Sequence, residues 1–129
     1  MIKILIVDDE TDLEILIRQK FRKKIREQQY EFVFAVNGND ALRKMLEFPD
    51  VEIVLSDINM PGMSGLELLK HIKEKYEKPP PVVMMITAYG DGENYRMAMK
   101  LGADDFLTKP LDFNSLKEKL KTIITWLRF

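Results

Sequence analysis

The chain has 129 residues, which fits one domain, and its 46% apolar and 32% charged residues are ordinary for a soluble globular protein. A formal net charge of −1 excludes a general basic field, so we expect no direct binding to nucleic acid or to an anionic membrane. The lack of cysteine excludes disulfides and thiolate metal sites, and no run approaches the ~20 apolar residues of a membrane span. We expect a single domain over residues 1–129, located in the cytoplasm.

Five short apolar segments are predicted to be the strands of a parallel sheet. In chain order they are Ile2 to Val7, Phe32 to Val36, Val51 to Leu55, Val82 to Ile86, and a weaker segment at Phe106 and Leu107. They are rich in Val and Ile and mostly continuous rather than alternating, which is typical of strands covered on both faces.

The segments between these strands have the spacing of amphipathic helices. The apolar positions run from Leu13 to Ile25, Ala41 to Leu46, Leu66 to Ile72, Met97 to Leu101 and Leu116 to Leu127. Thr11 with Glu14, and Ser64 with Glu67, fit the capping box that opens a helix, and Gly102 fits the end of the fourth helix. Strand and helix therefore alternate five times, which predicts an α/β fold, a doubly wound parallel sheet with helices on both faces.

Polar side chains stand at the carboxyl ends of four predicted strands, where ligands bind in open α/β sheets. The first strand ends at Asp8 and Asp9, the third at Asp57, the fourth at Thr87 and the fifth at Lys109. Three carboxylates in one crevice repel each other, and a hard cation such as Mg²⁺ relieves this while leaving room for a phosphate oxygen. Lys109 adds a compact positive charge and Thr87 a hydroxyl, the groups that hold a phosphoryl group in transfer. The set predicts phosphoryl transfer to an aspartate.

Several motifs, in order along the chain, resemble the receiver domain of two-component response regulators. They are Val7-Asp8-Asp9-Glu10, the segment Ser56 to Gly65, Ile86-Thr87-Ala88, Gly102-Ala103, and Phe106-Leu107-Thr108-Lys109-Pro110. Each motif is weak alone, but the full set spans essentially the whole chain and is specific. The resemblance implies a flavodoxin-like (βα)5 fold, as in chemotaxis receivers, with five parallel strands in the order 2-1-3-4-5.

The resemblance also assigns roles to the residues at the strand ends. Asp57 matches the phosphoacceptor, and Asp9, Asp57 and the backbone carbonyl of Asn59 match the ligands of Mg²⁺, with Asp8 acting through water. Thr87 and Lys109 match the catalytic pair that grips the phosphoryl group. The peptide bond from Lys109 to Pro110 is expected to be cis, because the cis form costs much less free energy before proline than before any other residue.

Three further positions are expected to control the switch and its lifetime. Phe106 matches the aromatic residue that turns inward on activation, and many relatives have tyrosine at this position. Thr87 is expected to move together with it. Asn59 and Tyr89 flank the route of an attacking water and are expected to tune how long the phosphoryl group persists.

The implied donor is a sensor histidine kinase or a histidine phosphotransfer protein, and the downstream effector is not identified. The fourth helix, fifth strand and fifth helix are expected to repack on phosphorylation and are a candidate dimer contact. Six basic residues between Arg18 and Arg26 form either a solvated helix face or a surface that steers the kinase. Trp126 and Phe129 near the chain end pack on the body, form a dimer contact, or lead into a further domain.

Three alternatives stay open. An aspartate-nucleophile phosphohydrolase would use Asp8 with Glu10 two residues later, but its Gly-containing loop and cap insertion are missing from the sequence. A flavodoxin-like electron carrier would need a Ser/Thr/Gly-rich phosphate loop after the first strand. A pseudo-receiver would act only as an interaction module. We expect no enzymatic turnover beyond self-catalysed phosphorylation and autodephosphorylation.

Overall fold

The computed structural model describes residues 1–76, 80–88 and 90–128. The five strands are β1 (Ile2–Val7), β2 (Tyr30–Ala35), β3 (Ile53–Asp57), β4 (Val82–Thr87) and β5 (Asp105–Thr108). The helices are α1 (Asp12–Lys20), α2 (Arg22–Arg26), α3 (Gly38–Glu47), α4 (Gly65–Lys75), α5 (Gly92–Lys100) and α6 (Phe113–Arg128). None of the helices in these described ranges is long and apolar enough to cross a membrane.

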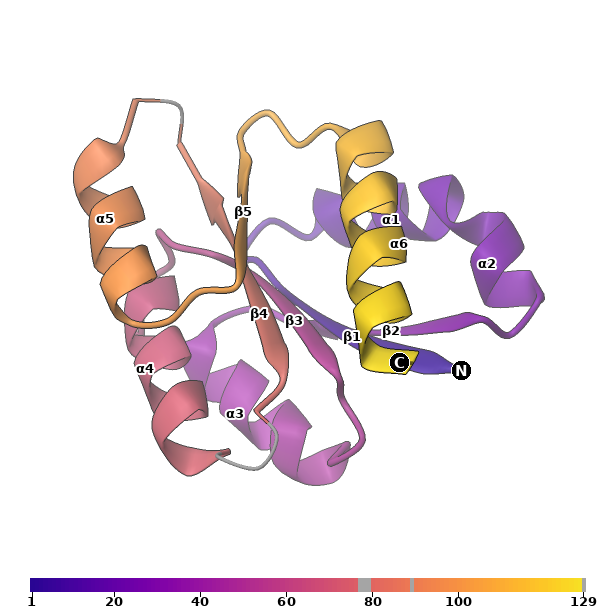
Figure 1. The fold of residues 1–129 in the computed structure, drawn as a ribbon, viewed down its shortest axis with the longest axis horizontal. Helices are drawn as coiled ribbons and strands as arrows, with labels where there is room; N and C mark the ends of the chain where they lie inside the picture. The colour runs from indigo at the N-terminus through magenta and orange to yellow at the C-terminus, as the bar shows by residue number, and fades with distance from the viewer. Residues whose placement is uncertain (77–79, 89, 129) are drawn as a thin grey trace.

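The strands form one parallel sheet in the order β2-β1-β3-β4-β5, which confirms the predicted topology. Helices cover both faces: α1, α2 and α6 lie on one side, and α3, α4 and α5 on the other (Figure 1). After each strand the chain returns through a crossover helix to the edge of the sheet where the strand began. The carboxyl ends of all five strands therefore lie together at the other edge.

Alternate side chains of the central strands feed two separate apolar cores. In β1, Leu5 and Val7 pack with α3, α4 and α5, whereas Ile4 and Ile6 pack with α1 and α6. All four are at most 2% exposed, which explains why the strand sequence is continuously apolar rather than alternating.

The first predicted helix is divided in the structure, and this is a correction to the sequence analysis. Phe21 separates α1 from α2 with φ −110° and ψ 19°, outside helical geometry. Its ring is 1% exposed and packs on Tyr30 and Phe32, with centroid distances of 6.0 and 5.2 Å. Periodicity continues through Phe21 because its ring still faces the core, so the pattern could not reveal the break.

The predicted helix caps have mixed outcomes. Ser64 caps α4 by accepting a hydrogen bond from the Glu67 N–H, and Gly102 has φ +94° after α5, as expected. Thr11 precedes α1 with helical φ and ψ, and its side chain makes no capping bond, so that capping box is wrong. The peptide from Lys109 to Pro110 is cis, as the resemblance implied.

Candidate functional site

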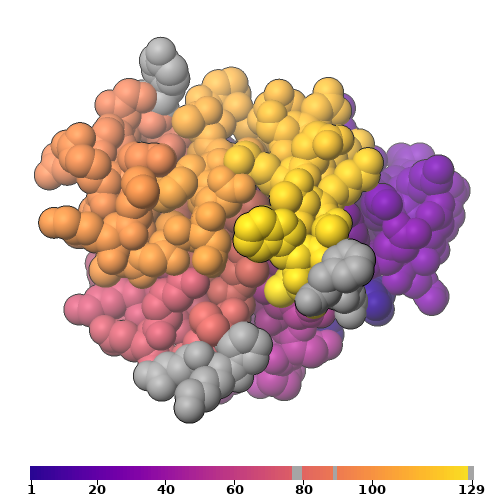
Figure 2. All heavy atoms as spheres, viewed as in Figure 1, coloured from indigo at the N-terminus to yellow at the C-terminus, as the bar shows by residue number. Residues whose placement is uncertain are grey.

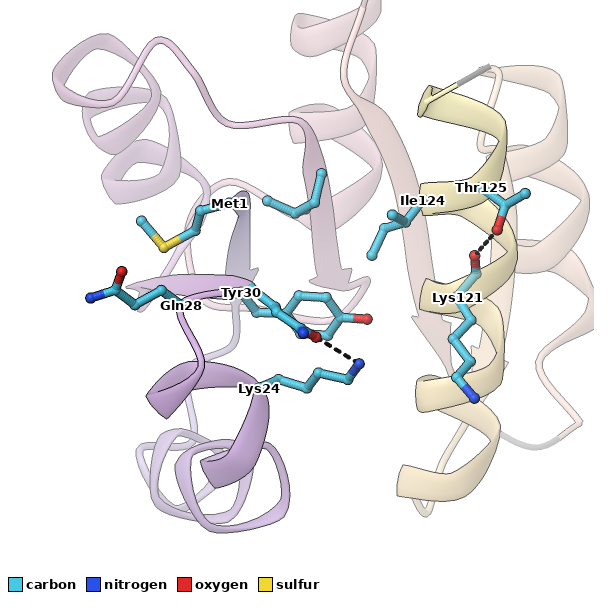
Figure 3. A pocket seen from close by; sticks show the side chains of 9 residues that line it. Met1, Lys24, Gln28, Tyr30, Lys121, Ile124 and Thr125 are labelled. Atoms are coloured by element: carbon cyan, nitrogen blue, oxygen red, sulfur yellow. Dashed lines mark hydrogen bonds between the residues drawn. The ribbon is translucent and has the colours of Figure 1, made fainter.

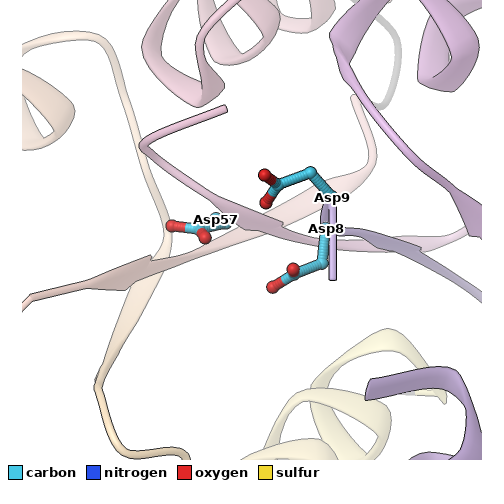
Figure 4. Close-up of side chains that lie close together, drawn as sticks. All are labelled: Asp8, Asp9 and Asp57. Atoms are coloured by element: carbon cyan, nitrogen blue, oxygen red, sulfur yellow. The ribbon is translucent and has the colours of Figure 1, made fainter. Parts of the chain in front are cut away.

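The strand register brings the acidic residues of the sequence to one edge of the sheet. Val7 pairs with Ser56, so Asp8 and Asp9 after β1 lie beside Asp57, the last residue of β3. Figure 4 shows the three carboxylates gathered at this edge. Asp57 lies inside the strand because β3 runs two residues further than the predicted segment, which ended at Leu55.

The three carboxylates form a cluster with graded burial. An oxygen from each of Asp8, Asp9 and Asp57 lies within 4.8 Å of the others. Asp57 is 2% exposed, Asp8 is half-buried and Asp9 is exposed. The Asp57 carboxylate accepts a hydrogen bond from the Asn59 N–H at 3.2 Å, and Asp8 accepts one from the Glu10 N–H at 2.7 Å. Burial raises the pKa of the Asp8 carboxyl, and the negative charge of Asp57 raises it further.

Lys109 supplies the positive charge that faces this cluster. Its Nζ lies 2.6 Å from Asp57 Oδ2, and its backbone N–H donates to the Thr87 carbonyl at 2.9 Å. Burial alone would lower the pKa of Lys109, but the hydrogen bond to Asp57 and the charges of Asp57, Asp8 and Glu10 outweigh it, so the pKa is raised. Lys109 is therefore an ammonium group held against the buried carboxylate.

A hydroxyl and a tight backbone contact complete the edge. Thr87 ends β4, is 4% exposed, and pairs in register with Thr108 of β5. Gly65 lies so close to the backbone of Asp57 that a Cβ built on Gly65 would be 2.1 Å from the Asp57 carbonyl oxygen. The Gly65 N–H also donates to the Ile58 carbonyl at 2.8 Å, which folds the intervening loop back onto the end of β3.

The other predicted positions lie around this core. Asn59 is exposed directly after the site, and Tyr89 lies outside the described residues. Phe106, in β5, is half-buried, and its ring packs against Tyr95 of α5 with centroids 4.3 Å apart. The sequence analysis missed Tyr95 and the close approach of Gly65. Gly65 ends the motif from Ser56 that resembles receiver domains, but its sequence position gives no sign of the close approach to Asp57, and no sequence signal marks the contact between Tyr95 and Phe106.

Comparison with known families agrees with this geometry. The family described as the response regulator receiver domain matches residues 4–121. The chain belongs to the response regulator receiver family. The family match and the sheet order together confirm the resemblance drawn from the motifs.

Solved receiver structures resemble this receiver domain along nearly its whole length. A response regulator receiver domain protein from Clostridium thermocellum is 28% identical with a TM-score of 0.85, covering 99% of this chain and 98% of its own. The chemotaxis protein CheY4 of Vibrio cholerae is 28% identical with a TM-score of 0.79, covering 95% and 98%. The receiver domain of NtrX from Brucella abortus is 30% identical with a TM-score of 0.76, covering 92% and 95%.

The acidic cluster of this receiver domain has the dimensions of a small divalent cation site. Two oxygens bound to one Mg²⁺ at ~2.1 Å are at most ~4.2 Å apart. Because the three carboxylate oxygens lie within 4.8 Å of each other, direct ligation by two of them and contact with the third through water needs only small movements. A set made only of oxygen donors is also the chemistry that Mg²⁺ prefers.

Proposed function

We propose that this receiver domain accepts a phosphoryl group on Asp57 from a phosphohistidine of a sensor histidine kinase or a histidine phosphotransfer protein. One observation carries the proposal: Asp57 is 2% exposed, yet its carboxylate meets Lys109 at 2.6 Å within a group of three carboxylates. A buried, hydrogen-bonded carboxylate beside a fixed ammonium is a competent nucleophile for phosphoryl transfer.

The step that this arrangement supports is an in-line displacement at phosphorus. A carboxylate oxygen of Asp57 forms the new O–P bond as the N–P bond to the donor histidine breaks, and the leaving imidazole nitrogen keeps the electron pair and takes a proton. Lys109 and the hydroxyl of Thr87 donate hydrogen bonds to the phosphoryl oxygens, whose charge spreads in the transition state. Hydrolysis later breaks the same O–P bond by attack of water.

The residues that would hold Mg²⁺ are Asp9, Asp57 and the backbone carbonyl of Asn59, with Asp8 acting through water. When bound, the cation offsets the charge of the carboxylates and of the phosphoryl oxygens. The half-buried Asp8 and the exposed Asp9 each present a carboxylate oxygen within 4.8 Å of one from Asp57, which supports a cation held jointly by the three residues.

The donor protein is proposed to approach over the amino-terminal half of α1. A hollow of about 250 Å³ beside the site is lined by Asp8, Lys109, Leu13 and Leu16, among others. Leu16 is 40% exposed, and its neighbour Ile15 is 58% exposed. Exposed aliphatic side chains next to the phosphoacceptor suit a partner that must bring a phosphohistidine into contact with Asp57.

The output is proposed to arise at the surface formed by α5, β5 and α6, which are the fourth predicted helix, the fifth strand and the fifth predicted helix. Thr87 and Lys109 move toward the new phosphoryl group, and Phe106 turns into the space that they leave, so Tyr95 loses its aromatic partner. Figures 1 and 2, drawn in the same view, show α5 and α6 on either side of β5 on the face toward the viewer. On this surface Tyr95, Met97 and Trp126 are 41%, 46% and 80% exposed, which suits a phosphorylation-linked dimer or an effector contact.

The experiment that tests the proposal is intact-mass spectrometry after incubation with acetyl phosphate. The wild-type protein is compared with Asp57→Asn, each with Mg²⁺ and with EDTA. We expect one added phosphoryl group, only in the wild type and only with Mg²⁺, and its removal by hydroxylamine, which cleaves acyl phosphates.

Two outcomes would overturn the proposal. An adduct that persists in Asp57→Asn would place the phosphoryl group on another residue. The second outcome is no adduct at all, together with no change in the amide NMR spectrum when beryllofluoride and Mg²⁺ are added. It would leave a pseudo-receiver that acts only through binding. Glu74→Gln, an exposed change on α4, is the matched control and should be phosphorylated like the wild type.

A further inference from the structure

A basic groove lies between α2 and α6, at the end of the molecule away from Asp57. Two hollows of about 280 and 580 Å³ adjoin there and share Lys24, Tyr30 and Lys121. Figure 3 shows Lys24 of α2 and Lys121 of α6 on opposite sides of the larger hollow, with the Tyr30 ring between the two helices. We call this surface the lysine groove.

The lysine groove concentrates positive charge in a protein whose net charge is −1. The smaller hollow is lined by five lysines, and the acidic residue among its lining residues is Glu118. The five are Lys20, Lys23, Lys24, Lys117 and Lys121. Within residues 1–76, 80–88 and 90–128, Lys23 is the one of the five with a carboxylate within 4.0 Å, that of Glu27. Among the described residues, the other four lysines therefore have no carboxylate at ion-pair distance.

Aromatic rings hold three of these lysines in place. Lys117 lies over the Phe21 ring at 5.7 Å, Lys24 over Tyr30 at 5.7 Å, and Lys20 over Phe113 at 6.0 Å from the ring centroid. A ring attracts an ammonium group through its quadrupole but adds no negative charge. The lysines are thus oriented by packing while their charge stays available to a ligand.

Helix stability does not explain the whole set. Lys20, Lys23 and Lys24 stand near the carboxyl ends of α1 and α2, where cations favour the helix dipole. Lys117 and Lys121 lie in the amino-terminal and middle turns of α6, far from its carboxyl end, and are four residues apart. Like charges at that spacing repel each other and disfavour the helix, so their presence on this face points to a binding role.

The two halves of the groove differ in chemistry. The smaller hollow carries the lysines, whereas the larger one adds the apolar side chains of Met1, Ile2 and Ile124 beside Tyr30. Lysine is a compact point charge suited to phosphate, whereas carboxylates are more often bound by the planar fork of arginine. Hollows of this total size take a small molecule.

We propose that the lysine groove binds an organic polyphosphate of the size of a nucleoside triphosphate. Its phosphate groups lie among Lys20, Lys117 and Lys121, and its organic part lies against Ile124 and Tyr30. The groove sits at the amino ends of β1 and β2, whereas Asp8 and Asp57 stand at the carboxyl ends of the strands. The proposal therefore does not depend on phosphorylation of Asp57.

The test is isothermal titration calorimetry of the whole chain in EDTA, which keeps divalent cations away from the acidic site. The probes are ATP, inorganic triphosphate, adenosine and a poly-glutamate peptide. We expect saturable binding of ATP with a Kd of about 10 µM to 1 mM in ~50 mM salt, weaker binding of triphosphate, and weakening of both by added salt.

A matched pair of variants separates the groove from general charge. The double variant Lys117→Gln/Lys121→Gln should weaken ATP binding at least about tenfold. Lys70→Gln/Lys100→Gln removes the same charge from exposed positions on α4 and α5 and should change it less than about twofold. Both should keep the circular dichroism spectrum and the urea denaturation midpoint of the wild type within about 0.3 M, which reports that they are folded.

Four results would overturn the proposal. No saturable ATP binding, or equal weakening by the two double variants, would show that the groove is an ordinary charged surface. Triphosphate binding as tightly as ATP would remove the organic part from the apolar half. Binding of poly-glutamate without binding of ATP would make the occupant an acidic protein segment instead.

Discussion

Replacing Lys109 with methionine removes the charge that faces Asp57 while keeping the length of the side chain. At 2.6 Å the attraction between the two charges is about 1.6 kcal/mol at the dielectric constant of water and about 6 kcal/mol at an effective value of 20. The Asp57 side chain is 3% exposed and that of Lys109 is 41% exposed, so the pair lies between exposed pairs and buried pairs. We expect Lys109→Met to lower the free energy of unfolding by about 1–3 kcal/mol in metal-free buffer.

Urea denaturation followed by circular dichroism in EDTA measures this loss, which corresponds to a midpoint shift of about 0.7–2 M. Lys70→Met, an exposed change on α4, should shift the midpoint by less than about 0.3 M. Mg²⁺ should stabilise Lys109→Met more than the wild type, because the carboxylates are then less neutralised by the protein. A midpoint for Lys109→Met equal to that of the wild type in EDTA would refute the reasoning.

Gly65→Ala places a Cβ 2.1 Å from the carbonyl oxygen of Asp57, the proposed phosphoacceptor, so urea denaturation should show a loss of unfolding free energy above ~2 kcal/mol and intact mass a loss of phosphorylation. Gly62→Ala, at φ +75° with open space, should cost only ~1 kcal/mol and remain phosphorylated. Asp40 accepts a hydrogen bond from the Val36 N–H and pairs with Arg43; these contacts outweigh burial and lower the pKa of its carboxyl. Asp40→Asn should therefore lower the free energy of unfolding by ~1 kcal/mol above pH ~4, and in urea titrations this difference should disappear as the pH falls through the lowered pKa. Tyr95→Ala removes the ring that packs against Phe106, so in the proposed switch Phe106 turns inward more easily and less beryllofluoride should be needed to reach the active-state amide NMR spectrum; an unchanged titration would contradict this.

The layered fold could be predicted from the sequence because each strand reports its surroundings directly. Ile4 and Leu5 point to opposite faces and are both fully buried, and a continuous apolar run is the signature of that arrangement. The break at Phe21 could not be predicted in the same way. Its ring keeps the helical period while its backbone leaves it, so only the packing against Tyr30 and Phe32 shows where α1 ends.

The acidic half of the candidate site could also be predicted, because Asp8, Asp9 and Asp57 follow or end strands whose carboxyl ends share one edge. The remaining contacts depend on pairs of residues that no local pattern links. The distance of Gly65 from Asp57 depends on how the loop folds back, and the contact of Tyr95 with Phe106 depends on how α5 packs beside β5. The lysine groove likewise joins α2 to α6, which are almost a hundred residues apart, so periodicity within either helix could not reveal it.

The place of β2 at the end of the sheet order has a consequence for solubility during signalling. Its sequence is rich in aromatic side chains, and an outer strand of this kind is a template for intermolecular β-pairing and aggregation. Glu31 places one charge within that strand and pairs with Lys3 of β1 at 3.6 Å. The proposed switch acts at α5, β5 and α6, and β5 is the strand at the opposite end of the sheet order. A receiver built this way can change its signalling surface at one end of the sheet without changing the pairing of β2 with β1 at the other end.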